Sequence, residues 1–180
     1  QYAIDLRYTE HPDVHVETLV NKGNANIGFA VQPIDDSRFE KIPLSTHQLY
    51  AIVNREHPLR DRKTLSYDDL HHQKLIIENN EFKLHQFIMQ KCEQRQVQPD
   101  LVFETSGLIL CHKMVRQNKG ISVTVDYMLN DAQYDNVIAI PFDDAGAVWE
   151  PCIILEKRYN IKPQYADFYS IYFAMERFCR

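Results

Sequence analysis

The feature of this sequence that most constrains its fold is the alternation of short apolar runs with longer amphipathic segments. Runs such as 26–31 and 74–78 have the length and composition of buried strands, and residues 82–96 place apolar side chains at helical spacing. Strands that alternate with helices need crossover connections, which predict parallel pairing and an α/β fold. The run 26–31 in particular is typical of a strand inside a parallel sheet covered on both faces. The expected strands are 2–8, 26–31, a strand region over 39–53 that ends with 49–53, 74–78, 101–104, 121–125, 137–140 and 152–155. The expected helices are 11–24, 66–70, 82–96, 108–118 and 165–178.

Capping and breaking residues mark the ends of several of these elements. Gly23 and Gly120 follow helical segments, and Pro99 lies just beyond another. Ser66 precedes a short segment with two acidic residues in its first turn, which predicts an N-cap. With no internal repeat and no low-complexity linker, the 180 residues form one ordinary domain or two small ones.

The charge and cysteine content exclude several classes of protein. The chain has 25 acidic and 20 basic residues, spread along its length, whereas binding to nucleic acid needs a dense basic face. No apolar run approaches the roughly 20 residues of a membrane span, and the first residues lack the order of a signal peptide. Four cysteines without a CxxC pair indicate reduced thiols in a cytoplasmic core, with a redox sensor or a disulfide as the alternative. We therefore expect a cytoplasmic chain that contacts no membrane.

Motifs that carry catalytic or metal chemistry are missing from the sequence. His71 and His72 are adjacent and would point to different faces of a helix, and no HExxH pattern accompanies His85. The sequence also lacks GxSxG, GxGxxG and GxxxxGK[ST] patterns. We therefore expect no enzyme activity, no metal site and no cofactor.

Polar residues that follow the expected strands are the candidates for ligand binding. In open α/β sheets, small molecules bind outside the carboxyl ends of the strands, where helix N-termini direct free N–H groups at anions. Amide and hydroxyl groups there suit a carboxylate, so the expected ligand is an organic or amino acid. A simpler role is open to some positions, since Ser106 can cap the following helix and Asn79 and Asn80 can form a turn. The candidate ligand-binding residues are Gln32, Pro33, Asn79, Asn80, Thr105, Ser106, Val123 and Thr124.

The order of several short motifs resembles that of a known family. The motifs are residues 21–31 (NKGNANIGFAV), 42–44 (IPL), 49–53 (LYAIV), 57–59 (HPL), 65–70 (LSYDDL) and 120–123 (GISV). In this order and spacing they resemble the effector-binding domain of LysR-type transcriptional regulators, over nearly the whole chain.

The resemblance implies a periplasmic-binding-protein-like fold of type 2, with two α/β subdomains joined by two crossover strands. Subdomain I would hold residues 1–51 and 150–180, and subdomain II residues 52–149, with the crossings near 50–53 and 146–151. The first strand and helix of the family would be missing, Gly28 replaces a common acidic residue, and Val125 replaces a proline. Positions matching Gln32, Ser106 and 123–125 line the ligand cleft in the family.

The function implied by the resemblance is ligand sensing in a bacterial transcriptional regulator. A small effector would bind between the subdomains and change their relative angle. This change would switch DNA binding through a helix-turn-helix domain absent from this chain. Family members form homodimers and tetramers, and the segments 11–24 and 82–96 match the helices that pair. The alternatives are a solute-binding protein of a transporter, which would carry a signal peptide upstream, and an enzyme on the same fold.

Overall fold

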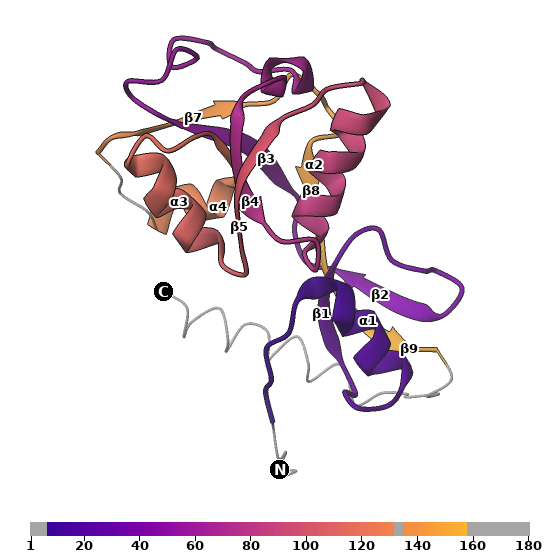
Figure 1. Cartoon of the computed structure of the whole chain (residues 1–180). Coiled ribbons are helices and arrows are strands. Elements are labelled where there is room, and N and C mark those ends of the chain that lie inside the picture. The colour runs from indigo at the N-terminus through magenta and orange to yellow at the C-terminus, as the bar shows by residue number, and fades with distance from the viewer. Residues whose placement is uncertain (1–6, 132–134, 158–180) are drawn as a thin grey trace.

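The computed structural model describes residues 7–131 and 135–157, whose elements form the two groups seen in Figure 1. The smaller group is a three-stranded sheet covered by one helix. Its strands are β1 (Gly28–Val31), β9 (Pro151–Glu156) and β2 (Phe39–Pro43) in that spatial order, and both pairings are antiparallel. The covering helix is α1 (Asp13–Asn21). The buried core of this group is formed by Val20, Ala30, Ile34, Phe39, Cys152 and Ile154.

A close approach of α1 to β1 explains the glycine at the start of that strand. A Cβ atom at Gly28 would lie 2.5 Å from Cγ1 of Val16 and 3.0 Å from Cγ2 of Val20. Real Cβ atoms do not approach so closely, so any side chain here would push the helix off the sheet. The absence of a side chain at Gly28 therefore sets the distance between the two layers.

The larger group contains an antiparallel sheet and a separate parallel pair. β3 (His47–Asn54) lies between β6 (Ser122–Val125) and β7 (Val137–Pro141), and its first residues pair with β8 (Val148–Trp149). β4 (Lys74–Glu78) and β5 (Asp100–Thr105) pair in parallel, and a parallel bridge from Leu75 to Ile121 joins them to the start of β6. The helices of this group are the short 3₁₀ helix η1 (Tyr67–Leu70), α2 (Lys83–Gln94), α3 (Leu108–Arg116) and α4 (Asp126–Asp131).

The core of the larger group forms between the sheets and the helices that follow β4 and β5. On one side, Leu84, Ile88 and Cys92 of α2 are buried in the cluster that contains Leu49 and Leu75. On the other, Cys111 and Val115 of α3 are buried with Ile52 and Ile76. The 3.6-residue spacing of these apolar positions is what makes each helix pack by one face.

The element positions expected from the sequence agree with the structure better than the strand pairing does. Helices are present within 11–24, 82–96 and 108–118, and the expected cap at Ser66 is present, because its side chain and that of Asp69 form a capping box on η1. The expected helix at 165–178 and residues 2–6 of the first expected strand lie outside the described residues. Arg7 and Tyr8 are described and belong to no strand.

The expectation of a mainly parallel sheet is wrong. β1, expected inside a parallel sheet, pairs antiparallel with β9, and β3 pairs antiparallel with three strands. Among the described strands, only β4 and β5 follow the strand–helix–strand pattern with parallel pairing. The physical reason is that local periodicity reports which face of a strand is buried, whereas the direction of pairing depends on partners far away in the sequence.

Candidate functional site

The parallel pair β4 and β5 brings two of the predicted site segments together. The backbone N–H of Asn79, just after β4, donates to the carbonyl of Thr105 at the end of β5 across 2.7 Å. The side chains of both residues form hydrogen bonds within their own turns. Asn79 Oδ1 accepts a hydrogen bond from the N–H of Glu81 at 3.1 Å, and Thr105 Oγ1 accepts one from the N–H of Gly107 at 3.3 Å. These two loops therefore form one surface, but the amide oxygen and hydroxyl expected to face a ligand are partly engaged within it.

The next residue of each of these loops is exposed. Asn80 and Ser106 both lie on the surface, and the carbonyl of Asn80 accepts the side-chain amide of Gln86 at 2.9 Å. The N-cap of α3 is Gly107 rather than Ser106, and no side chain caps this helix. The capping role considered for Ser106 is therefore wrong, and its hydroxyl lies beside the start of α3 without serving as its cap.

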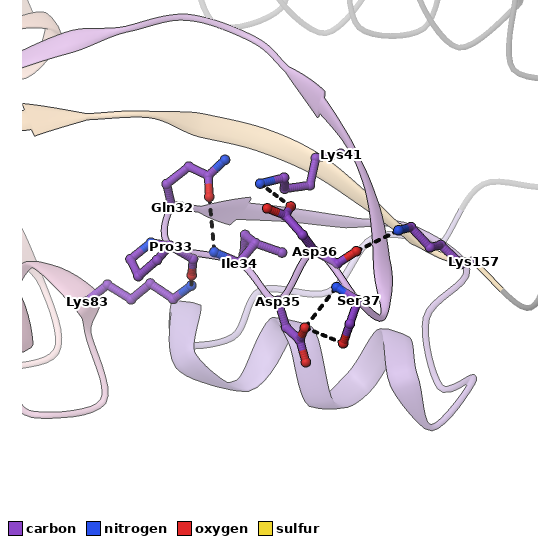
Figure 2. A network of polar contacts seen from close by, with 9 residues as sticks. All are labelled: Gln32, Pro33, Ile34, Asp35, Asp36, Ser37, Lys41, Lys83 and Lys157. Carbon is purple, nitrogen blue, oxygen red and sulfur yellow. Dashed lines mark hydrogen bonds and ion pairs between the residues drawn. The ribbon is translucent and has the colours of Figure 1, made fainter.

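The loop after β1 contacts Lys83, as Figure 2 shows. The side-chain carbonyl of Gln32 accepts the N–H of Ile34 at 3.0 Å, so it shapes its own loop. The carbonyl of Pro33 accepts a hydrogen bond of 2.8 Å from Nζ of Lys83, at the start of α2. Gln32 and Pro33 thus lie next to the beginning of α2, which itself follows the Asn79 loop.

Lys83 makes most of this contact between the two groups of elements. Besides Pro33, its ammonium group donates to the carbonyl of Val31 and pairs with Glu17 of α1, both at 2.7 Å. The backbone N–H of Lys83 donates to Oδ1 of Asp13 at 2.8 Å. Since its side chain is only 11% exposed, these contacts are largely shielded from water and hold the start of α2 against α1 and the end of β1.

The structure places the last two predicted site residues in the interior. Val123 and Thr124 lie in β6 with no exposed area, and the Thr124 hydroxyl is 2.8 Å from Nε2 of His112. Burial lowers the pKa of His112, which favours the neutral ring in this contact. These residues are therefore not brought to the surface formed by the Asn79 and Thr105 loops.

Sequence reasoning missed Glu78, the last residue of β4. Its side chain is 9% exposed, and burial raises the pKa of its carboxyl to about 7. The nearby carboxyl of Asp13 adds to this rise, while a hydrogen bond from the N–H of Leu108 at the start of α3 opposes it. Burial also raises the pKa of Asp13, against the lowering effect of Lys83. The strand context hid Glu78, because its position at the end of an apolar run suggests a residue that simply terminates the strand.

A second polar cluster lies where β3 begins and β6 ends. Ser45 Oγ is 2.8 Å from Nε2 of His47, whose Nδ1 is 2.7 Å from Oδ1 of Asp126. The other carboxylate oxygen of Asp126 accepts the N–H of Gln48 at 2.9 Å. Burial opposes ionisation of Asp126, but the hydrogen bonds from Gln48 and His47 together outweigh it and lower its pKa. The sequence carried a signal here, because Asp126 directly follows an expected strand.

Tyr127 packs against the second polar cluster. Its ring packs edge-on against His47 with 4.8 Å between the ring centroids, and the residue is 42% exposed. Burial raises the pKa of the phenol, and the nearby charges of Glu78 and Asp126 add to the rise, while a hydrogen bond with the Trp149 side chain opposes it. Tyr127 thus lies within electrostatic reach of both Glu78 and Asp126.

Among the residues that the structure describes, no three or more His, Cys, Asp or Glu side chains gather in a way that could hold a metal ion. Within the same residues, no helix is long and apolar enough to cross a membrane.

Comparison with solved structures defines the class of the fold. The regulatory domain of CcmR from Synechocystis PCC6803, in complex with 2-PG, matches with a TM-score of 0.78 at 13% identity, covering 91% of this chain and 79% of that one. The effector-binding domain of QuiR in complex with shikimate matches with a TM-score of 0.74 at 15% identity, covering 89% and 76%. The fold is therefore that of effector-binding domains, a periplasmic-binding-protein-like fold of type 2, as expected from the sequence.

The sequence comparisons identify the family. The model of the LysR substrate binding domain matches residues 3–172, and the chain belongs to this family. An uncharacterized HTH-type transcriptional regulator of Bacillus subtilis (strain 168), YwbI, is 26% identical over 154 residues, covering 86% of this chain and 51% of that protein. The chain spans about half the length of the curated relatives it matches. These relatives are transcriptional regulators, so the transporter alternative is not favoured.

Proposed function

We propose that this chain is the ligand-sensing domain of a bacterial transcriptional regulator, and that it controls DNA binding by the full-length protein. The observation that supports this most directly is the family match over residues 3–172. Binding would be non-catalytic and cytoplasmic, and DNA would be contacted only by a helix-turn-helix domain elsewhere in the protein. The neighbouring structures whose titles name shikimate and 2-PG support a small organic ligand.

The proposed ligand site lies where α1 and the loop after β1 meet the loops after β4 and β5. In this proposal the ligand lies between the two subdomains expected from the sequence, residues 1–51 with 150–180 and residues 52–149. A ligand that touches both can change their relative angle only by binding one arrangement more tightly than the other. The contacts of Lys83 with Glu17, Val31 and Pro33 belong to the arrangement described here and would favour it.

A homodimer, with tetramers formed from it, is the proposed assembly. Helices α1 and α2 correspond to the segments expected to pair. Within the described residues β5 pairs only with β4, and Leu101 and Val102 of β5 are 37% and 43% exposed. An unpaired edge that carries exposed apolar side chains is a surface that a second chain can cover.

The experiment that tests the sensing function is a thermal-shift scan against organic acids, amino acids, aromatic acids and nucleotides. A ligand at a hundredfold excess over its dissociation constant adds about 2.7 kcal/mol to stability, which is a shift of about 5 to 10 °C for a chain of this size. Asn80→Ala, in the loop after β4, should reduce the shift, whereas Asn24→Ala, at another exposed asparagine, is the matched control. A hit should also change DNA binding of the full-length protein in fluorescence anisotropy. A flat scan would count against a small-molecule sensor.

A further inference from the structure

The second polar cluster is a chain of hydrogen bonds that the sensing function does not use. Ser45 Oγ lies 2.8 Å from Nε2 of His47, and Nδ1 of the same ring lies 2.7 Å from Oδ1 of Asp126. A hydroxyl, an imidazole and a carboxylate joined in this order are the arrangement by which serine hydrolases activate their nucleophile. The motif search could not detect it, because Ser45 lies in no GxSxG pattern and Asp126 is 79 residues from His47.

The strands bring these three side chains together. Ser45 and His47 are two residues apart where the chain enters β3, and this spacing puts two side chains on one face of an extended chain. β6 pairs antiparallel with β3, and Asp126 directly follows β6, so its carboxylate reaches the start of β3. The N–H of Gln48 donates to Oδ2 of Asp126 at 2.9 Å. The carboxylate is therefore held beside the imidazole by the backbone of β3 itself.

The positions of the protons follow from these contacts. Burial opposes ionisation of Asp126, but hydrogen bonds from Gln48 and His47 lower its pKa, so the carboxylate is charged and can only accept. In a neutral ring the proton of His47 therefore lies on Nδ1, and Nε2 carries the lone pair that accepts the Ser45 hydroxyl. The nucleophile and the base are thus aligned for transfer of a proton from Oγ to Nε2.

The cluster is fixed in orientation and open to small molecules. The Tyr127 ring packs edge-on against His47 and restricts rotation of the imidazole. Ser45 is half-buried, and the side chains of His47 and Asp126 are 25% and 38% exposed. Within the described part of the chain, the N–H groups of Ser45 and Thr46 donate to no backbone carbonyl. Both are therefore available as donors to the carbonyl oxygen of a substrate.

We propose that Ser45 is a nucleophile that accepts an acyl group from small activated esters, with His47 as its general base and Asp126 as the residue that positions His47. Ser45 Oγ forms a bond to the carbonyl carbon of the ester while its proton moves to Nε2 of His47. The bond from that carbon to the leaving oxygen then breaks, and Nε2 returns the proton to this oxygen, which departs as an alcohol. Water activated by the same imidazole releases the acyl group as a carboxylic acid and restores the Ser45 hydroxyl.

The inference does not rest on the sensing function, because this cluster shares no residue with the proposed ligand site. Ser45 lies in the segment that connects β2 of the smaller group to β3 of the larger group. The preceding residue, Leu44, donates its N–H to the carbonyl of Pro151 at 3.1 Å. An acyl group on Oγ replaces the proton that bonds to His47, so acylation also removes a hydrogen bond next to this connection.

The test is covalent labelling of the full-length protein with an alkyl fluorophosphonate, followed by mass spectrometry of its peptides. Ser45 Oγ displaces fluoride from phosphorus, so the reaction adds one phosphonyl group and releases hydrogen fluoride. Ser37 is the internal control, because its exposed hydroxyl donates to the carboxylate of Asp35 at 2.6 Å rather than to an imidazole. Ser45 should react at least about a hundredfold faster than Ser37, which is the contribution of a positioned general base. p-Nitrophenyl acetate should acetylate the same residue.

Variants of the cluster separate activation of Ser45 from simple exposure. His47→Gln removes the base, and Asp126→Asn removes the charge that holds the ring, so each should lower the labelling rate at Ser45 about a hundredfold. Ser37→Ala is the matched control and should leave that rate unchanged. Melting curves recorded in parallel show whether each variant is folded. If a variant unfolds, the comparison of Ser45 with Ser37 in the wild type still decides.

Two results would overturn the proposal. The first is equal labelling of Ser45 and Ser37 in the wild type. The second is an unchanged rate at Ser45 in a folded His47→Gln variant. In either case the hydrogen bonds would only fix the start of β3, a role that predicts a lower melting temperature in His47→Gln but no selective reaction at Ser45.

Discussion

Replacing Lys83 with methionine tests whether its contacts hold α2 against the smaller sheet. Methionine keeps the apolar stem and has a helix propensity similar to that of lysine, so the change removes mainly the ammonium group. That group makes one ion pair and two hydrogen bonds to carbonyls, all at 2.7 to 2.8 Å. Charged hydrogen bonds contribute about 1.5 to 3 kcal/mol each, but Glu17 is 26% exposed and water can replace part of its share.

We therefore expect Lys83→Met to cost about 3 kcal/mol of unfolding free energy, or about 6 to 12 °C in melting temperature. Urea unfolding followed by circular dichroism measures the change. Lys113→Met is the matched control, because Lys113 is exposed on α3, and its cost should stay within about 0.5 kcal/mol. Glu17→Gln should destabilise the wild type but have little further effect in Lys83→Met. Equal stabilities for the two methionine variants would refute the reasoning.

Three further predictions follow from features of the fold. Folding raises the pKa of Glu78 from 4.5 to about 7, so the stability contributed by its protonated form is fully present below pH 4.5 and is lost as the pH rises through 7. Glu78→Gln, which keeps the group neutral, should therefore be about 3 kcal/mol more stable than the wild type at pH 8 and about equal to it at pH 4.5 in urea titrations. A constant difference would contradict this. Gly28→Ala should lower stability by about 1 to 3 kcal/mol in the same assay, because the new methyl group overlaps Val16, and an unchanged midpoint would show that α1 can move away. A Leu101→Lys and Val102→Lys double variant should shift the protein toward monomer in analytical ultracentrifugation, and an unaffected dimer would exclude the edge of β5 as the interface.

The sequence predicted the elements of the larger group because their apolar spacing is local. β4, α2, β5 and α3 each occupy the segment expected for them, and the family resemblance supplied their arrangement. The antiparallel pairing of β1 with β9 could not be read in this way, since nothing within either strand records the direction of its partner. α4 was missed for a related reason: it is short and follows β6 directly, so no helical period is visible.

The sequence predicted which two loops lie side by side, and it missed the buried carboxyl group of Glu78 that precedes one of them. The rule that ligands bind after strand ends located the Asn79 and Thr105 loops, which the structure places side by side. It also selected Thr124, whose hydroxyl is instead buried against His112. Glu78 escaped notice because the sequence shows a carboxyl group at the end of a strand but not the removal of water around it. Burial is a property of the folded chain, and it is what raises the pKa of Glu78.

The central position of β9 in the smaller sheet has a consequence for the order of folding. β1 and β2 do not pair with each other, and each is hydrogen-bonded to β9. Gly28 and Ile42 can therefore pair with Ile154 and Ile153 only after β9 has been synthesised. A chain emerging from the ribosome carries β1 and β2 long before their shared partner is synthesised. The parallel pair of β4 and β5, joined by α2, has its partners close in sequence and can form early, whereas long-range pairing is slow. The half of the proposed ligand site contributed by the loop after β1 is therefore completed last, when residues 151–156 pair with β1 on one side and β2 on the other.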